Sequence, residues 1–260
     1  MTDTASDDLR RARRFQESLA RRLSPVVHGA GWATGLFNPE LPDVWNLNYV
    51  VLDDPGPAET SSGVAEVTDR LMGKAGCRHR RVTVEDEAVG ARLADGFREL
   101  GWQVHRFCEM ALRRPPDRPS PHPARRLELD TYIEAKRAFM EREPEGKRPD
   151  VVRQLVEHIR LAHRSIDHRL FGAGGSLESL CEMFVEDGVA QIEDVGTLSE
   201  QRGRGLARAV VLEAIDSARA TGCDLVFLVA DADDWPKALY EKLGFEEIGV
   251  SYAFLLTNSQ

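Results

Sequence analysis

A short glycine-containing segment between a predicted strand and a predicted helix constrains this chain most. Residues 202–207 read Arg-Gly-Arg-Gly-Leu-Ala. Before them, residues 189–198 alternate like a strand, and after them apolar residues recur at helical spacing until Gly222. A glycine turn that ends a strand and opens a helix gathers main-chain N–H groups at the positive end of the helix dipole. The sequence therefore predicts an anion-binding turn suited to a pyrophosphate.

Two common phosphate-binding motifs do not match this turn. A Walker A loop requires Gly-Lys-Ser or Gly-Lys-Thr, and neither follows the turn. The dinucleotide fingerprint requires a third small residue where this chain has Arg208, and the expected strand with a terminal acid is missing. Gly203 and Gly205 still allow a ligand to approach the main chain closely, because they lack a Cβ atom.

The segments after this helix predict a buried strand, a short helix and a final strand. Residues 224–230 form a continuous apolar run, which is typical of a central strand. Residues 235–243 predict a short helix that has Asp234 as N-cap and ends at Gly244. Residues 246–256 then read as a strand.

Two amphipathic helices and a hairpin are predicted upstream of the turn. The helices cover residues 130–141 and 150–166, where apolar residues share one face. The dipeptide Asp187-Gly188 is a two-residue hairpin signal that joins the strands 179–185 and 189–198.

The turn and the later short helix together resemble the GCN5-related N-acetyltransferase (GNAT) family. Residues 202–207 match the family's acetyl-CoA pyrophosphate loop, R/Q-x-x-G-x-G/A, and residues 238–245 match its second signature, a tyrosine helix followed by Gly-Phe. The resemblance implies an α/β (α+β) fold with a twisted, mixed, largely antiparallel sheet flanked by helices. It also implies acetyl-CoA as co-substrate and direct attack by a primary amine on the acetyl group.

The resemblance assigns the donor-binding roles. The main-chain amides of residues 202–207 would hold the pyrophosphate, with Arg202 and Arg204 able to add positive charge. A main-chain N–H of Leu228 or Val229, where the family's central strands splay apart, would stabilise the oxyanion. The expected cofactor-binding residues are Arg202, Gly203, Arg204, Gly205, Leu206, Ala207, Leu228, Val229 and Asp233.

The resemblance also suggests an acid and a base. Tyr240 resembles the general acid, since a phenol is protonated at neutral pH. Glu193 and Asp194 lie where the family often places a basic carboxylate, and strand alternation turns one of them toward the cleft, with Glu193 preferred. Two departures affect the neighbouring turn, because Asp233 replaces the usual cofactor-contacting asparagine and Pro236 replaces the usual alanine.

The helices 130–141 and 150–166 would wall the acceptor site, as the family's helices between its first two strands do. His158, His163 and His168 lie on or just beyond the second of these helices. Helical histidines are more often surface or capping residues than bases, so we assign no catalytic role to them.

The chain before residue 113 resembles the C-terminal half. In both halves a strand follows a Gly-Cys pair, and a helix then ends at a glycine followed by an aromatic residue. Gly101 and Leu112 have the same spacing as Gly244 and Leu255. We infer a duplicated unit, so the chain resembles a tandem GNAT protein.

The first copy lacks the residues of the expected chemistry. Phe97 is opposite Tyr240, and residues 60–65 hold one glycine and no arginine where a phosphate loop should be. Residues 113–123 are dense in proline and predict a semi-rigid, solvated connector. The predicted division is a degenerate GNAT-like domain at 1–113, a proline-rich linker at 114–124 and a GNAT acetyltransferase domain at 125–260.

Composition narrows the partners. The formal net charge of −9 argues against a nucleic-acid partner, and no apolar run is long enough to span a membrane. The acidic start of the chain does not read as a signal peptide. The scattered cysteines read as free thiols in a reducing cytoplasm, not as ligands of a metal, so we expect no metal and a cytoplasmic location. These cysteines are Cys77, Cys108, Cys181 and Cys223.

Three functions remain open at this stage. The first is an acetyl-CoA-dependent N-acetyltransferase with its active site in the C-terminal half and a small-molecule or peptide amine as acceptor. The second is a non-catalytic acyl-CoA-binding sensor or interaction module. The third is an O-acyltransferase or a longer-chain acyltransferase. The assembly is also open between a homodimer and a single chain whose duplication imitates one.

Overall fold

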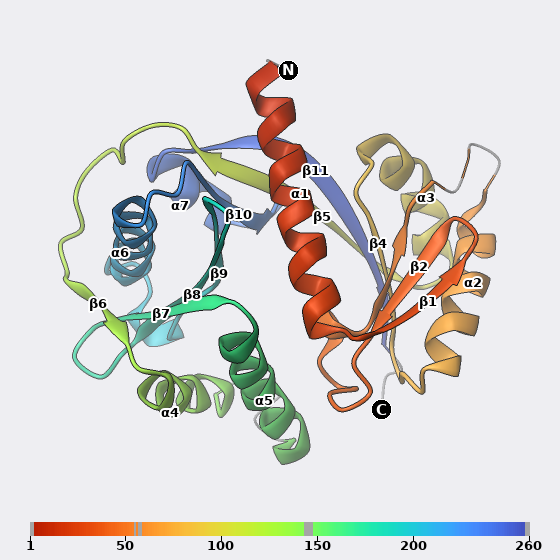
Figure 1. The fold of residues 1–260 in the computed structure, drawn as a ribbon, viewed down its shortest axis with the longest axis horizontal. Coiled ribbons are helices and arrows are strands. Elements are labelled where there is room, and N and C mark those ends of the chain that lie inside the picture. Colours follow the sequence, from red (N-terminus) through yellow and green to blue (C-terminus); the bar gives the residue numbers. More distant parts are fainter. Residues whose placement is uncertain (1–2, 55, 57–58, 143–147, 258–260) are drawn as a thin grey trace. The chain divides into compact units, whose positions relative to one another are not determined.

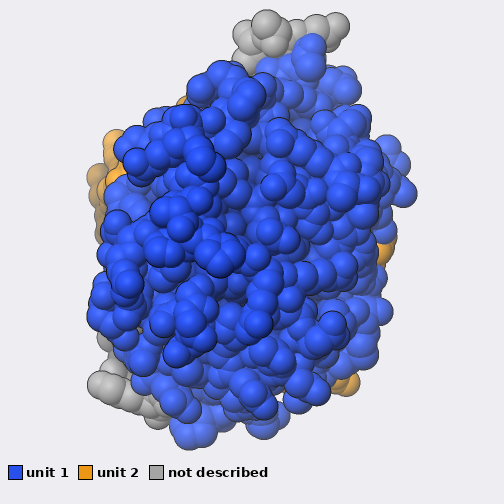
Figure 2. Space-filling model, turned by 90° about the vertical axis from the view of Figure 1, so that its left-hand side faces the viewer, with its two compact units in different colours: residues 1–15, 109–230, 234–248 blue, residues 16–108, 231–233, 249–260 orange. Residues whose placement is uncertain are grey.

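The computed structural model describes residues 3–54, 56, 59–142 and 148–257. The chain divides into two compact units (Figure 2). The first lies within residues 1–15, 109–230 and 234–248, and the second within residues 16–108, 231–233 and 249–260. This division differs from a cut at a single linker, because the ends of the chain contribute to both units.

The first unit is built on a mixed sheet with helices α4, α5 and α6 (Figure 1). Its strand order is β11-β5-β10-β9-β8-β7-β6, and neighbours from β6 to β9 are antiparallel whereas β9 and β10 are parallel. Its elements are α1 (Asp3–Leu23, up to residue 15), β5 (Gln103–Leu112), β6 (Ala124–Leu127), α4 (Leu129–Met140), α5 (Pro149–Ser165), β7 (Asp167–Ala173), β8 (Ser179–Glu186), β9 (Val189–Thr197), η3 (Ser199–Gln201), α6 (Leu206–Ala220), β10 (Leu225–Asp231), α7 (Pro236–Lys242) and β11 (Phe245–Leu256).

The predicted hairpin between β8 and β9 is confirmed. Asp187 and Gly188 both have positive φ, 49° and 77°, as a two-residue turn requires for its central residues. Val185 pairs with Ala190 on one side of this turn. The hairpin therefore fixes which residues of β8 and β9 lie opposite each other.

Helices cover both faces of this sheet. Leu180 belongs to an apolar cluster with residues of α4 and α5, such as Ile133 and Ile159. The next residue, Cys181, faces α6, because its Sγ lies 3.5 Å from the carbonyl of Val210. Successive strand residues point to opposite faces, so α4 and α5 lie on one face and α6 on the other (Figure 1).

The second unit holds a sheet of order β1-β2-β3-β4-β11-β5 with helices α2 and α3. Parallel pairing joins β3 to β4, whereas β11 pairs with β4 antiparallel. The elements not yet named are β1 (Val26–Ala30), β2 (Ala33–Phe37), η1 (Trp45–Leu47), β3 (Tyr49–Leu52), α2 (Ser61–Lys74), β4 (Arg80–Val84) and α3 (Glu87–Glu99). The strands β5 and β11 contribute residues to both units.

The order of elements repeats between the halves of the chain. The series α2-β4-α3-β5 recurs as α6-β10-α7-β11. Phe97 contacts Trp102 edge-on at 5.0 Å between ring centroids, and Tyr240 contacts Phe245 in the same way at 6.2 Å. The repeated aromatic pair occupies the end of α3 in one half and of α7 in the other.

The start of α2 differs from the start of α6. Thr60 caps α2, and its hydroxyl accepts a hydrogen bond from the N–H of Gly63 at 3.2 Å. The Glu59 carboxylate accepts from the N–H of Thr60 at 3.2 Å. The N-terminal half thus satisfies this helix terminus with its own oxygen atoms, which disfavours a phosphate there.

The proline-rich connector is held against the first unit at several points. The N–H groups of Arg113 and Arg114 donate to the carbonyl of Gly244 at 2.9 and 3.1 Å, and the N–H of Asp117 donates to the carbonyl of Lys242 at 2.9 Å. The sequence predicts a solvated linker here, and its side chains are mostly exposed. Its main chain, however, is anchored by contacts between residues far apart in the sequence.

Candidate functional site

The predicted phosphate turn exists as an open loop at the start of α6. Gly203 and Gly205 have positive φ of 77° and 86°, and Gly205 is the N-cap of the helix. The N–H groups in the first turn of α6 have no acceptor within the helix, so they are available to an anion. A Cβ atom at Gly203 would meet nothing within 4 Å, so no neighbouring side chain of the described residues fills this part of the loop.

The arginines of the loop are held at its edge. The Nε of Arg202 donates to the carbonyl of Thr197 at 3.3 Å, and a guanidinium nitrogen of Arg204 donates to the side-chain oxygen of Gln201. Both arginine side chains are exposed. Their charges therefore lie beside the loop, where a phosphate oxygen could reach them.

The proline-rich connector contacts this loop. A Cβ atom at Gly205 would come within 3.1 Å of a Pro121 side-chain carbon. His122 Nε2 lies 2.9 Å from the carbonyl oxygen of Arg204. Glycine at position 205 thus serves both the left-handed turn and the close approach of the connector.

The strands β9 and β10 separate just beyond the last paired residues. Their parallel register runs from Leu225 opposite Val189 to Leu228 opposite Ile192. The N–H of Leu225 donates to the carbonyl of Gly188 at 3.3 Å, toward β9. Because N–H groups alternate in direction along a strand, the N–H of Val229 also points toward β9, whereas that of Leu228 points away. This geometry favours Val229 over Leu228 as a main-chain donor in the opening between the strands.

Glu193 and Asp194 occupy an irregular point of β9. The pairing of β8 with β9 shifts by one residue here, and Asp194 has a positive φ of 53°. A Gln191 side-chain nitrogen donates to a carboxylate oxygen of Glu193, and a carboxylate oxygen of Asp194 pairs with Lys136 Nζ. The Asp194 side chain is 45% exposed, whereas Glu193 is more enclosed. The irregularity therefore separates the environments of two adjacent carboxylates.

Burial and the charge of Asp194 raise the pKa of Glu193 to about 7. Burial also raises the pKa of Asp194, although the ion pair with Lys136 opposes the rise. A carboxyl with a pKa near neutrality can accept a proton at physiological pH and release it again. Glu193 thus has the environment expected of a general base.

Tyr240 lies on α7 in the same unit and is 7% exposed. Burial and the charge of Glu193 raise the pKa of Tyr240 above its ordinary value. The phenol consequently stays protonated and can donate a proton. The charge of Glu193 thus acts on the predicted acid, and both residues belong to the same unit.

Asp233 belongs to the second unit, unlike the other predicted site residues. Its N–H donates to the Asp231 carboxylate at 2.9 Å in a local turn. The helix α7 begins at Pro236 with Trp235 as N-cap, so the expected N-cap Asp234 is one residue too early. The carboxylate of Asp234 instead accepts from the N–H of Trp235 at 2.7 Å.

A buried polar cluster next to Glu193 was not predicted from the sequence. Glu182 on β8 accepts from the Tyr132 hydroxyl at 3.0 Å and lies 3.0 Å from His168 Nε2. His168 is fully buried on β7, so the expectation of a surface or capping histidine is wrong for it. Its place one residue after Asp167, in a strand whose remaining residues are buried, could have indicated this.

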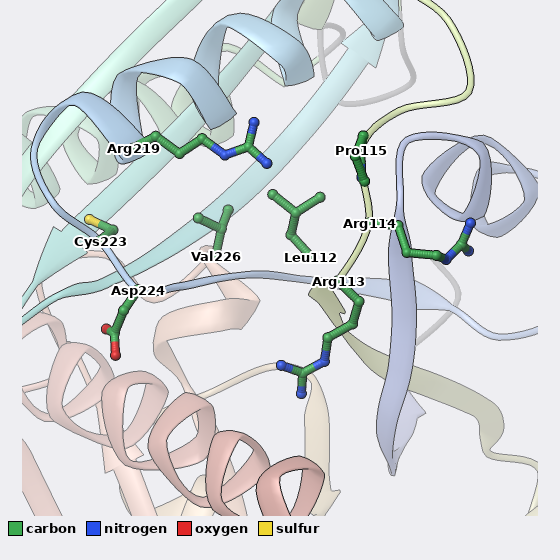
Figure 3. Close-up of a pocket in the computed structure, with 8 residues that line it drawn as sticks. All are labelled: Leu112, Arg113, Arg114, Pro115, Arg219, Cys223, Asp224 and Val226. Carbon is green, nitrogen blue, oxygen red and sulfur yellow. The ribbon is translucent and has the colours of Figure 1, made fainter.

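A separate hollow of about 230 Å³ lies at the other end of α6 (Figure 3). Arg113 in its wall is paired with Asp8 at 2.6 Å, and Asp224 with Arg11 at 2.6 Å. The Arg114 side chain points away from Leu112 and Val226 at the centre (Figure 3). Arg113 and Asp224 are thus engaged with α1, and the hollow does not include the loop at the start of α6. Its lining residues are Leu112, Arg113, Arg114, Pro115, Arg219, Cys223, Asp224 and Val226.

Comparison with known proteins identifies the family of the C-terminal half. The model of the acetyltransferase (GNAT) family matches residues 123–245, which include the loop, both strands of the opening and Tyr240. This region is a GNAT domain. Membership supports an acyltransferase, with acetyl-CoA as the co-substrate that the family implies and amines as the acceptors on which its enzymes act. No curated protein sequence matches the chain.

Solved structures extend the GNAT fold over the whole chain. A GCN5-related N-acetyltransferase from Kribbella flavida is 20% identical, with a TM-score of 0.63, and the match covers 95% of each chain. A conserved protein of unknown function from Staphylococcus epidermidis is 17% identical, with a TM-score of 0.65, and covers 89% of this chain and 93% of its own. A tandem GNAT protein from the clavulanic acid biosynthesis pathway is 16% identical, with a TM-score of 0.53, and covers 89% of this chain and 82% of its own. At these identities the likeness concerns the fold, and the predicted α/β fold class is confirmed.

Three further observations concern the described residues. None of their helices is both long enough and apolar enough to cross a membrane. They hold no group of three or more His, Cys, Asp or Glu residues arranged to bind a metal ion. The four cysteines are free thiols.

Proposed function

We propose that the GNAT domain is an N-acetyltransferase that transfers the acetyl group of acetyl-CoA to a primary amine by direct attack. The observation that carries the proposal is that one unit holds Glu193, whose pKa is raised to about 7, and the protonated phenol of Tyr240, whose pKa the charge of Glu193 raises. A protein that only binds acyl-CoA needs neither group in this state.

Donor binding rests on the loop at the start of α6. Residues 202–207 offer first-turn N–H groups, two glycines with positive φ and two exposed arginines, which suit a pyrophosphate. Acetyl-CoA supplies an activated thioester carbonyl. The N–H of Val229, directed into the opening between β9 and β10, is suited to stabilise the developing oxyanion.

Acid–base roles follow from the two environments. Glu193 takes the proton that the attacking amine must lose as its nitrogen bonds to the carbonyl carbon. Tyr240 donates its proton to the thiolate that leaves when the carbon–sulfur bond breaks. The amine ends as an amide and the donor as free CoA, so the two proton transfers balance. Asp194, paired with Lys136, is the less suitable base because its carboxylate is already engaged by a cation.

The N-terminal half is, in this proposal, a degenerate copy of the same unit. Phe97 takes the place of Tyr240 and cannot donate a proton. Thr60 and Glu59 occupy the helix terminus that a phosphate would need. We propose that one working site serves the tandem chain, at 125–260, and that 1–113 and the linker 114–124 support it.

The proposal includes a cytoplasmic location, to which the four free thiols are suited. A small-molecule or peptide amine is the proposed acceptor, and the alternatives of sensor, O-acyltransferase and longer-chain acyltransferase make different experimental predictions. A homodimer would be recognised by the mass of the protein in solution.

The function is tested with purified protein, several acyl-CoA thioesters and a panel of small and peptide amines and alcohols. We expect free thiol to appear with acetyl-CoA and an amine, together with the acetylated amine in the mass spectrum. CoA binding in calorimetry without thiol release from any acceptor would contradict the enzyme and favour a sensor. Faster turnover of longer thioesters would favour a longer-chain acyltransferase, and faster turnover of alcohols would favour an O-acyltransferase.

A further inference from the structure

Glu182 is a buried carboxylate with two fixed hydrogen-bonding partners. It lies on β8 and is 6% exposed. Tyr132 from α4 donates to one carboxylate oxygen, and His168 from β7 contacts the other, each at 3.0 Å. Burial opposes its ionisation, but the hydrogen bond from His168 and the nearby charges of His168 and Lys136 together lower the pKa of Glu182. Glu182 is therefore an anion whose position is set by three secondary-structure elements.

This anion lies directly opposite Glu193. The two residues are cross-strand partners in the antiparallel pairing of β8 with β9. Side chains at directly opposed positions share one face, with Cβ atoms roughly 5 Å apart, and like charges there repel. A negative charge fixed on Glu182 consequently makes it harder for Glu193 to lose its proton.

Other charged and titratable groups surround Glu182 and Glu193. Lys136 on α4 is matched by Asp194 on β9. Burial lowers the pKa of His158 on α5, which favours its neutral form. Tyr240 on α7 stays protonated. The charge of Asp194 also raises the pKa of Glu193, and the charge of Glu182 adds to that rise.

We propose that Glu182 is a positioning residue for the reaction: a fixed buried anion, held by Tyr132 and His168 opposite Glu193, that adds to the effect of burial and of Asp194 in making Glu193 a proton acceptor. The role of Glu182 in turnover rests on the proposed function. The effect of its charge on the pKa of Glu193 does not. A purely structural role would not need the charge, because a glutamine has the same shape and could also accept from Tyr132. Replacing Glu182 by glutamine therefore separates the effect of its charge from that of its shape.

The ionisation of both residues can be measured without any reaction. Carbon-13 labelling of glutamate side chains and NMR titration of the intact protein give a midpoint for each carboxyl. We expect Glu182 to remain ionised down to pH 5 and Glu193 to titrate near neutrality. A Glu182 that is protonated at pH 6, or a Glu193 with the midpoint of an ordinary carboxyl, would overturn the proposal without any variant.

The substitution Glu182→Gln then removes the charge and keeps the shape. We expect the Glu193 midpoint to fall by about one pH unit, since like charges at this separation interact at that scale even with strong screening. The matched control is Glu186→Gln, the same change on the same face of β8 four residues away, which should leave the midpoint unchanged.

Turnover provides a second and separate readout. If an amine acceptor is found, the acid limb of kcat/KM should move to lower pH in Glu182→Gln by the same interval, with the affinity for acetyl-CoA preserved. An unchanged Glu193 midpoint in a folded Glu182→Gln protein would refute the role of Glu182. Absence of turnover in the wild type would instead refute the enzyme, and the NMR titration would still decide the electrostatic coupling.

Discussion

Arg208 on α6 and Asp117 in the connector form an ion pair of 2.6 Å in which the arginine side chain is 3% exposed and the aspartate is 43% exposed. The Arg208 guanidinium also donates to the carbonyl of Arg118 at 3.0 Å. One partner is therefore buried while the other reaches solvent. The ion pair and this hydrogen bond hold the connector against the helix that follows the candidate phosphate loop.

The asymmetry predicts unequal costs for the two ways of breaking the pair. Asp117→Asn leaves a buried guanidinium without its counter-charge and should lower the free energy of unfolding by about 3 kcal/mol. Arg208→Met leaves a carboxylate that water can solvate and should cost about 1 kcal/mol. Urea unfolding measures both, with Asp216→Asn in the exposed pair with Arg219 as a control that should change little. Equal losses in the free energy of unfolding for Asp117→Asn and Arg208→Met would contradict the importance of the burial of Arg208.

Tyr240→Phe should reduce turnover and leave donor binding nearly intact. Phenylalanine keeps the edge-on contact with Phe245 but has no proton to give to the leaving thiolate. General acids typically contribute roughly 10²- to 10⁴-fold to the rate, so kcat should fall within that range. Steady-state kinetics and CoA calorimetry on the same preparation test this. A variant with wild-type kcat would exclude Tyr240 as the acid.

Glu193 also makes a pH-dependent contribution to stability. Folding raises its pKa from the ordinary value of 4.5 to about 7, so the folded state retains a proton that the unfolded state has lost. This contribution is fully present below pH 4.5 and is lost as the pH rises toward 7. On going from pH 4.5 to pH 8, Glu193→Gln should therefore gain about 3 kcal/mol relative to the wild type. Parallel pH profiles for the two proteins would contradict the raised pKa.

Lys136→Met tests the acceptor side of the site. The Lys136 side chain is 15% exposed and its partner Asp194 is 45% exposed, so the loss of stability should be about 1 kcal/mol. If α4 walls the acceptor site, as the resemblance to the family implies, KM for the amine should change while the affinity for acetyl-CoA does not. Arg142→Met, in an exposed pair with Glu200, is the control and should alter neither. A weaker affinity for acetyl-CoA in Lys136→Met would place this pair on the donor side instead.

The sequence indicated those parts of the fold that depend on local patterns. The Asp187-Gly188 hairpin and the turn at Gly203 and Gly205 were predictable, because glycine and aspartate tolerate the positive φ that these turns require. The helices α4 and α5 begin and end within one residue of the predicted bounds, since their apolar faces repeat at helical spacing.

The parts that sequence reasoning missed depend on contacts between distant residues. Nothing near Arg208 in the sequence shows that Asp117 neutralises it, and nothing near Glu182 shows its place between Tyr132 and His168. The shift of pairing at Asp194, which separates its environment from that of Glu193, likewise appears only in the register with β8. Strand alternation alone would assign the two carboxylates to opposite faces without distinguishing their chemistry.

The central claim is that the main chain at the start of α6 binds the pyrophosphate of acetyl-CoA, and calorimetry on two glycine variants tests it most directly. Gly205 precedes α6 and Gly222 follows it, with similar φ of 86° and 80°, so valine introduces a similar φ strain at both positions, and at Gly205 it also approaches Pro121. Acetyl-CoA should bind the wild type and Gly222→Val with similar affinity, whereas Gly205→Val, if folded, should bind at least about tenfold more weakly. A Gly205→Val protein that binds acetyl-CoA with the wild-type dissociation constant would contradict the assignment.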